Sequence, residues 1–335
     1  MVKPLDIPFT PDLHMRLLLS LDRGQNVQRA VTSAVRPGDR VLDAGTGSGL
    51  LAFVALAAGA ATAVGVDRHH VELAGAIAAH NGLADRLTFL QAELAELELS
   101  SFDPPKKFDL LLAFIHTNNP LIDEARSRLV FELRDRLCAD GATVVPGAVR
   151  YRATGCDRRD WDLHTELADL GQTAAVLRGA YGLDFQPLAD AVRAELAHQR
   201  MRPVDAVAHT WRSPTTMAAL RFPRSDVHLL TAAHDFATFD YSAPAFTGFP
   251  DRIRLRAAVP GRLTGVLWTQ ELLYAGEPLW TTESYSPLAT PVAVAAGDDV
   301  TIATGDEWRA SNIVRQQTAT AAAGSVPEPV HSHPM

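Results

Sequence analysis

The stretch Val41-Leu42-Asp43-Ala44-Gly45-Thr46-Gly47-Ser48-Gly49 decides the fold of this chain. It opens with an apolar run of strand type, continues with three glycines at alternate positions, and is followed by a helical pattern from Leu50. Glycine lets such a turn close tightly and lets a ligand lie against bare backbone. The stretch therefore predicts a strand, a ligand-binding turn and a helix in succession.

The segments around this turn alternate between helical and strand patterns up to Pro146. Residues 13–35 have an amphipathic helical pattern that is interrupted near Gly24. Helices are predicted over 50–58, 70–80 and 123–137, and strands over 40–43, 63–67, 87–90, 108–114 and 143–145. Such alternation implies a parallel sheet with helices on both faces. We expect an α/β fold in which residues 1–146 form a Rossmann-like domain.

The second half of the chain has a different pattern. A helical stretch over about 161–200 precedes short β-rich runs at 226–230, 252–259, 265–273 and 292–295, which turn residues separate. This predicts a mainly antiparallel, β-barrel-like domain over 147–315 with a helical arm. Residues 316–335 are rich in Ala, Thr, Gly and Pro, which predicts a disordered tail, so its His331 and His333 are not expected to bind a metal.

Charge and composition exclude several classes of function. The net charge is −8 and only three lysines occur, so no basic surface for nucleic acid is expected. No apolar run reaches the ~18 residues of a membrane span. The two cysteines, Cys138 and Cys156, form no CxxC pair, which fits a reducing compartment and no thiolate metal site. Prolines and acidic residues near the N-terminus are unlike a secretory signal, so we predict a cytoplasmic protein.

The type of ligand follows from the residues of the turn. A dinucleotide fingerprint would place its third glycine at Leu50, and Asp43 would repel a pyrophosphate. Asp43 suits a cation instead, and S-adenosylmethionine carries a sulfonium and an ammonium but no phosphate. Asp67 ends the next predicted strand, where a carboxylate accepts ribose hydroxyls. We therefore predict S-adenosylmethionine as the cofactor, bound by Asp43, Gly45, Thr46, Gly47, Gly49 and Asp67.

The stretch from Val41 to Asp67 resembles motif I and the acidic strand of class I methyltransferases, which implies a seven-stranded cofactor domain. Further segments are similar to the protein arginine methyltransferase branch, and the resemblance covers roughly residues 13–305. Leu13-His14-Met15 with Asp22-Arg23 is similar to the family's cofactor-covering helix, so His14, Met15 and Arg23 would contact the methionine part. Residues 181–185 are similar to its dimerisation arm, which implies a homodimer.

Three further residues are candidates for the cofactor. Glu93 follows the third predicted strand and is placed to accept from the adenine amino group, and Arg68 directly follows Asp67. Phe114 could face the sulfonium, because cations are attracted to ring faces. The alternatives stay open: loop carboxylates are usually solvated, and aromatic residues usually belong to the core.

The arginine-binding residues of that family are not kept. Its two clamp glutamates, nine residues apart, correspond to Phe114 and Asp123, and a phenylalanine offers no bidentate carboxylate to a guanidinium. The family's Thr-His-Trp motif has no clear counterpart near residues 286–291. A protein arginine is therefore not the expected acceptor.

A polar loop, His116-Thr117-Asn118-Asn119-Pro120, stands in place of the clamp. An Asn carbonyl can orient an acceptor amine, and His116 has a side chain whose usual pKa suits proton removal near neutrality. We therefore predict His116, Asn118, Asn119 and Asp123 as the catalytic group. The alternative is that Asn118 or Asn119 only caps the helix that follows.

These observations leave several functions open. The first is N- or O-methylation of a small metabolite or natural-product intermediate. The second is attack on the aminocarboxypropyl carbon, including cyclisation to azetidine-2-carboxylate, with release of methylthioadenosine. The third is a protein arginine methyltransferase-like enzyme with altered specificity, and the fourth is a non-catalytic binding module. The predicted partner is a small molecule, with no nucleic acid and no membrane.

Overall fold

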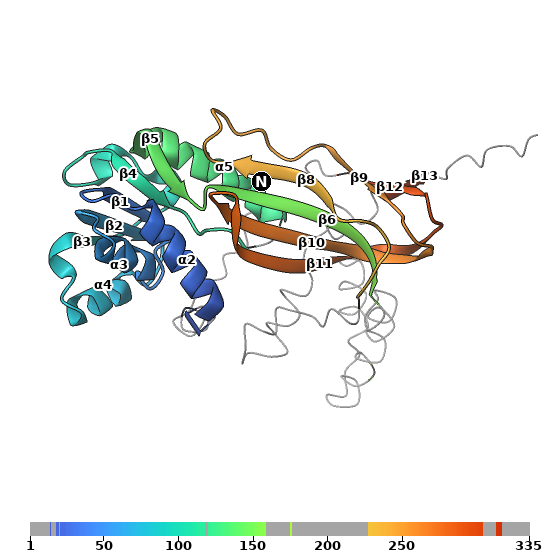
Figure 1. Cartoon of the computed structure of the whole chain (residues 1–335), viewed down its shortest axis with the longest axis horizontal. Helices are drawn as coiled ribbons and strands as arrows, with labels where there is room; N and C mark the ends of the chain where they lie inside the picture. Colours follow the sequence, from blue (N-terminus) through green and yellow to red (C-terminus); the bar gives the residue numbers. More distant parts are fainter. Residues whose placement is uncertain are drawn as a thin grey trace, which may run out of the picture.

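The computed structural model describes residues 14, 18–19, 21–117, 120–158, 175, 227–303 and 313–316. A parallel sheet with its helices forms one end of the molecule, and long antiparallel strands form the other (Figure 1). The predicted arm lies outside the described residues except for residue 175, and so does the predicted tail after residue 316.

The first half forms one parallel sheet with the strand order β3-β2-β1-β4-β5. The strands are β1 (Arg40–Ala44), β2 (Thr62–Asp67), β3 (Leu87–Gln91), β4 (Phe108–Leu112) and β5 (Cys138–Val145). The Rossmann-like α/β prediction is confirmed, and five strands of this sheet lie within the described residues, where the resemblance implied seven. After β5 the chain passes Pro146 and pairs with antiparallel partners. The order reverses beside β1, and the carboxyl ends of strands at such a point form a ligand crevice.

Helices cover both faces of this sheet. They are α2 (Leu21–Ala34), α3 (Leu50–Ala57), α4 (Val71–His80) and α5 (Pro120–Leu137), with short 3₁₀ turns η1 (Ala84–Arg86), η2 (Leu94–Glu96) and η3 (Leu99–Ser101). Successive strand residues point to opposite faces. Val41 packs in the cluster of α2 and α3, whereas Leu42 packs in the cluster of α5. The uninterrupted apolar runs of the sequence therefore reflect burial on both sides.

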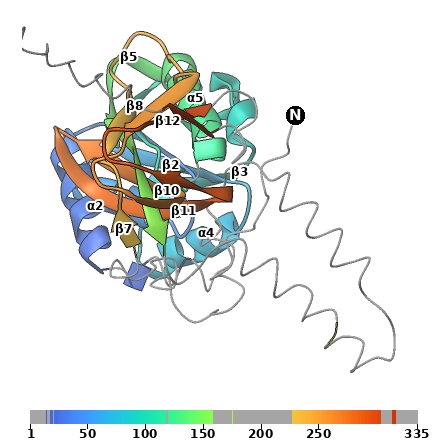
Figure 2. The same cartoon turned by 90° about the vertical axis from the view of Figure 1, so that its right-hand side faces the viewer.

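The second half is built from antiparallel strands (Figure 2). They are β6 (Ala148–Arg158), β7 (Val227–Leu229), β8 (His234–Asp240), β9 (Arg252–Arg256), β10 (Gly261–Tyr274), β11 (Glu277–Val294), β12 (Asp299–Ala303) and β13 (Ile313–Gln316). One sheet has the order β11-β10-β6-β7, with β8 also on β6, and a second has the order β13-β12-β9. The antiparallel prediction is confirmed, and closure of these sheets into a barrel stays a prediction.

The two halves share one hydrophobic core. A single buried cluster includes Leu111 of β4, Phe131 of α5 and Trp268 of β10. Backbone hydrogen bonds from Gly147 N–H to Leu273 O (2.8 Å) and from Tyr241 N–H to Gly147 O (2.9 Å) join the segment after β5 to the antiparallel strands. The division at residues 146 and 147 into two domains stays a prediction, and the core crosses it.

Among the described residues, no helix is long and apolar enough to cross a membrane.

Candidate functional site

The glycine-rich turn crosses the carboxyl end of β1 in the conformation that the sequence predicts. Gly45, Gly47 and Gly49 have φ values of 78°, 54° and 84°, which residues with a side chain rarely adopt. The turn is also closely packed: a Cβ on Gly45 would lie 2.7 Å from Cγ2 of Ile115, and one on Gly47 would lie 2.8 Å from Cε1 of His14. Both conformation and space therefore require glycine here.

Asp43 lies beneath this turn and is fully buried. Its Oδ2 accepts a hydrogen bond of 2.7 Å from Thr46 Oγ1, and its carboxyl also interacts with the backbone of Ala52 in α3. Burial raises the pKa of Asp43 to about 7, against the lowering effect of these hydrogen bonds. The carboxyl group thus joins the turn to the start of α3 and titrates near neutral pH.

We expect the affinity for S-adenosylmethionine to rise with pH through about 7. A bound cation favours the ionised carboxylate, so binding releases a proton from Asp43 wherever that group is still protonated. Calorimetric dissociation constants at pH 6 and pH 8 should differ by up to about tenfold for the native chain. The Asp43→Asn variant is the control, because the cofactor's own titration is the same for both proteins. An equal pH dependence in both would contradict the role of Asp43.

Asp67 connects the turn to the end of β2. Its Oδ2 accepts a hydrogen bond of 2.9 Å from Gly47 N–H, and its Oδ1 accepts one of 2.7 Å from Arg68 N–H. Arg68 Nε lies 3.8 Å from Glu93 Oε1, and the two side chains are 38% and 54% exposed, so this pair contributes little to stability. Asp67, Arg68 and Glu93 therefore lie together along the edge of the sheet beside the turn.

The two described N-terminal candidates, His14 and Arg23, lie in different surroundings. The His14 ring lies over Gly47 and meets the His70 ring edge-on, with the ring centroids 6.4 Å apart. Burial lowers the pKa of His14, although the charge of Asp67 opposes this effect. Arg23, in α2, lies with its guanidinium carbon 5.6 Å from the ring centroid of Trp280 in β11. Met15 lies outside the described residues.

The position of Arg23 depends on the antiparallel sheet. Besides the Trp280 ring, Asn26 Nδ2–H donates to Leu279 O at 3.3 Å, so α2 is held against β11. Burial lowers the pKa of Arg23 from its usual value. This contact could not be predicted from the sequence, because no local pattern links residue 280 to residue 23.

The loop after β4 is tied down by Asp123, which is fully buried in the first turn of α5. Asp123 Oδ1 accepts from Thr117 N–H at 2.9 Å and from Thr117 Oγ1–H at 3.0 Å. Asp123 Oδ2 accepts from Gln270 Nε2–H of β10 at 2.6 Å. Phe114 is half-buried and packs against both hydrophobic clusters. The residues at the two clamp positions are thus engaged within the protein.

His116 belongs to a buried polar group that sequence reasoning did not find. Its Nε2 lies 2.9 Å from the Tyr241 hydroxyl and 3.1 Å from Ser127 Oγ. Its Nδ1 is buried and has no hydrogen-bond partner among the described residues. Burial lowers the pKa of His116 to about 4; Asp123 opposes this and Arg126 adds to it. The ring is therefore neutral at physiological pH.

Asn118 and Asn119 lie outside the described residues, so their predicted part in the site stays a prediction. The described neighbours of this loop come from distant segments: Tyr241 from just after β8, Gln270 from β10 and Tyr151 from β6. Only a tertiary fold brings such residues together.

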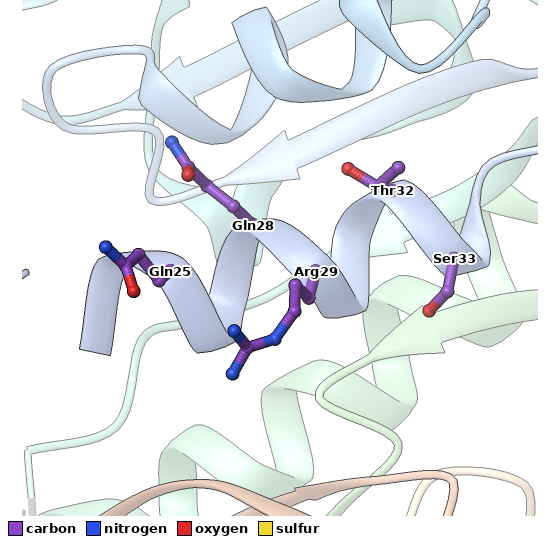
Figure 3. Close-up of a pocket in the computed structure, with 5 residues that line it drawn as sticks. All are labelled: Gln25, Gln28, Arg29, Thr32 and Ser33. Carbon is purple, nitrogen blue, oxygen red and sulfur yellow. The ribbon is translucent and has the colours of Figure 1, made fainter. Parts of the chain in front are cut away.

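A separate hollow of about 450 Å³ lies on the polar face of α2 (Figure 3). Its lining includes Gln25, Gln28, Arg29, Thr32 and Ser33. None of these is a predicted site residue. No cluster of metal-ligating side chains occurs among the residues that the structure describes.

Comparison with known proteins agrees with this geometry. Residues 25–154 match the family model "Ribosomal protein L11 methyltransferase (PrmA)". The ribosomal protein L11 methyltransferase of Thermus thermophilus is 36% identical over 126 residues, which are 37% of this chain and 44% of that protein. The ribosomal protein arginine N-methyltransferase rmt3 of Schizosaccharomyces pombe is 28% identical over 150 residues, 43% of this chain and 26% of that one. The match thus spans less than half the length of either relative.

Solved structures match over much more of the chain. The Trypanosoma brucei PRMT1 enzyme-prozyme heterotetrameric complex with AdoHcy superposes with a TM-score of 0.59 at 18% identity. The match covers 87% of this chain and 86% of that one. At this identity the likeness concerns the fold, and it includes the antiparallel half.

The prediction of a small-molecule partner is wrong in the light of these relatives. The two sequence relatives are named as methyltransferases of ribosomal proteins. The sequence had suggested a small acceptor because the arginine clamp is missing, but loss of one recognition device does not exclude a protein substrate. The accompanying prediction of a homodimer also lacks support, since the solved relative is named as a heterotetrameric complex and the arm lies outside the described residues.

The strand order, the glycine-rich turn and the matches agree with one another. In its fold and its cofactor-binding region the chain resembles the class I methyltransferases that use S-adenosylmethionine, and among these the protein arginine methyltransferase branch.

Proposed function

We propose that this protein transfers the methyl group of S-adenosylmethionine to a protein acceptor other than arginine. The named relatives support a protein acceptor. The exclusion of arginine rests on the surroundings of Asp123. Its two oxygens accept hydrogen bonds from Thr117 and Gln270, and its side chain is fully buried. With Phe114 at the other clamp position, these two positions provide no carboxylate pair for a guanidinium.

Methyl transfer from S-adenosylmethionine requires little help from a base on the acceptor side. The sulfonium makes the methyl carbon electrophilic, so the protein has to align a nucleophile with it and exclude water. Without the clamp, no pair of carboxylates at these positions offsets the cost of burying a permanently charged acceptor. An uncharged nitrogen or oxygen nucleophile suits these surroundings better. We propose His14, Met15, Arg23, Asp43, Gly45, Thr46, Gly47, Gly49, Asp67, Arg68, Glu93 and Phe114 as cofactor-binding residues, and His116, Asn118, Asn119 and Asp123 as residues of the acceptor side.

The test uses the full chain with S-adenosylmethionine labelled on its methyl group and a fractionated cell extract. Label is expected in a protein fraction, on a residue other than arginine, with one S-adenosylhomocysteine formed per methyl group. The same incubation with a Gly47→Val variant controls for background labelling. Mass spectrometry of the labelled protein then locates the acceptor residue.

Each other outcome contradicts a different part of the proposal. Label on arginine would show that the guanidinium is accepted without the clamp. Label only in small molecules would remove the protein acceptor. Methylthioadenosine as the co-product would show attack on the aminocarboxypropyl carbon in place of methyl transfer.

A further inference from the structure

A buried hydroxyl cluster surrounds His116 and consists of Ser127, Tyr151 and Tyr241. The Ser127 hydroxyl lies 3.1 Å from His116 Nε2, and the Tyr241 hydroxyl lies 2.9 Å from the same nitrogen. Ser127 is also close enough to the hydroxyls of Tyr151 and Tyr241 to lower their pKa, against the larger effect of burial. Ser127 and Tyr151 are fully buried, and Tyr241 is 1% exposed. Burial raises the pKa of both tyrosines well above the ordinary value, so both keep their protons.

Asp123 fixes the direction of the hydrogen bonds at one end of this cluster. Gln270 Nε2 donates to Asp123 Oδ2 at 2.6 Å, which places the amide nitrogen, rather than the amide oxygen, near Tyr151. The same nitrogen donates to the Tyr151 hydroxyl oxygen at 3.0 Å. Tyr151 therefore accepts a hydrogen bond from Gln270.

The remaining protons can be followed in the same way. Ser127 and Tyr241 each have one hydroxyl proton, and both hydroxyls lie within hydrogen-bond distance of the same atom, His116 Nε2. If Nε2 carried a proton, one hydroxyl would be left without an acceptor in a buried site, which is costly. With Nε2 as an acceptor, a hydroxyl proton of Ser127 or Tyr241 has a partner inside the buried site.

We propose that the hydroxyl cluster holds His116 as the neutral tautomer protonated on Nδ1, and that this N–H recognises the acceptor substrate. The atom is buried and has no partner among the described residues, so a hydrogen-bond acceptor on a ligand would satisfy it. His116 follows β4 at the carboxyl edge of the sheet, where ligands bind in this type of fold.

The proposal rests on the proposed function and narrows its substrate class. An Nδ1–H bond selects a protein acceptor group with a lone pair close to the methylated atom, such as a carbonyl oxygen or an uncharged nitrogen. It rejects a guanidinium, which has donors only. His116 then acts as a recognition residue rather than as the base that the sequence suggested, and Ser127 and Tyr241 act as positioning residues.

Nitrogen NMR of histidine side chains tests the tautomer without any substrate. The chain has twelve histidines, and the signal that disappears in a His116→Asn variant identifies residue 116. The native chain is expected to show a protonated Nδ1 and an unprotonated Nε2 at pH 7. Tyr241→Phe and Ser127→Ala should each keep this form, because one hydroxyl donor to Nε2 remains. The double variant should lose it, and Tyr274→Phe, at a partly exposed tyrosine outside the cluster, should not change it. A protonated Nε2 in the native chain would overturn the proposal.

Substrate recognition is tested with the acceptor fraction that takes up methyl label. An Asn side chain places an N–H close to the position of Nδ1, whereas Leu places none. His116→Leu should raise the KM for the acceptor by about tenfold or more, while His116→Asn should recover much of the loss, and neither should change the cofactor dissociation constant. Equal losses in both variants, confined to kcat, would indicate a base and overturn the recognition role. Absence of any methylated protein would contradict the proposed function, yet the NMR result would stand by itself.

Discussion

A Gly47→Val variant is expected to lose S-adenosylmethionine binding while the rest of the chain stays folded. Gly47 has a φ of 54°, and a β-branched residue is a genuine outlier in that region. The new Cβ would also lie 2.8 Å from Cε1 of His14. Relief of either conflict moves the Gly47 N–H away from Asp67 Oδ2, which it now meets at 2.9 Å. Because the cofactor is expected to lie against this backbone, we expect at least about a hundredfold weaker binding, roughly 3 kcal/mol.

Titration calorimetry with S-adenosylmethionine measures this effect, and circular dichroism establishes that the variant is folded. The matched control is Gly75→Ala in α4, where the nearest atom to a new Cβ is Cδ2 of Phe89 at 3.9 Å. That change should leave binding unchanged and stabilise the helix by up to about 1 kcal/mol. A folded Gly47→Val protein with native affinity would show that the cofactor does not use this turn.

An Asp123→Leu variant is expected to lose about 3–5 kcal/mol of unfolding free energy. The carboxylate is fully buried and accepts from Thr117 N–H, Thr117 Oγ1–H and Gln270 Nε2–H. Leucine has a similar size but accepts nothing, so these donors would be left buried and unpaired. The substitution breaks contacts between three elements, because the loop after β4, α5 and β10 all meet at the Asp123 side chain.

The free energies of unfolding of the variants and the native chain are measured by urea titration, with tryptophan fluorescence as the signal. Asp135→Asn on the same helix is the control, since Asp135 is 61% exposed and pairs with Arg134 at the surface. Its effect should stay within about 1 kcal/mol. If both variants unfold at the same urea concentration as the native chain, Asp123 does not hold the loop to the antiparallel sheet.

Sequence reasoning located the cofactor turn because the constraint there is local. Gly45, Gly47 and Gly49 are needed for backbone angles that only glycine adopts easily, and Asp43 and Asp67 end neighbouring parallel strands. The same reasoning read Asp43 as a partner for a cation. The structure shows its hydrogen bond with Thr46, and its part in binding the cofactor stays a prediction. A motif gives the identity of such a residue but not the direction in which its side chain points.

The antiparallel half was harder to predict because its strands pair over long distances in the sequence. β6 pairs with β10, β7 and β8, and neither β6 nor β8 was expected as a strand. β6 has a local alternation, with Val149 and Tyr151 buried between half-buried Arg150 and Arg152, but its pairing partners depend on the shared core. The helical arm predicted between β6 and β7 lies outside the described residues.

The sequence alone therefore predicted the parallel sheet, the cofactor and the loss of the arginine clamp, because each depends on a short pattern of a few neighbouring residues. Only the tertiary structure decided what surrounds the acceptor loop. Tyr241 lies 125 residues from His116 in the chain, and Gln270 lies 147 residues from Asp123. Hydrogen bonds between such residues form because burial leaves each polar atom no other partner, and no spacing rule along the chain encodes that requirement.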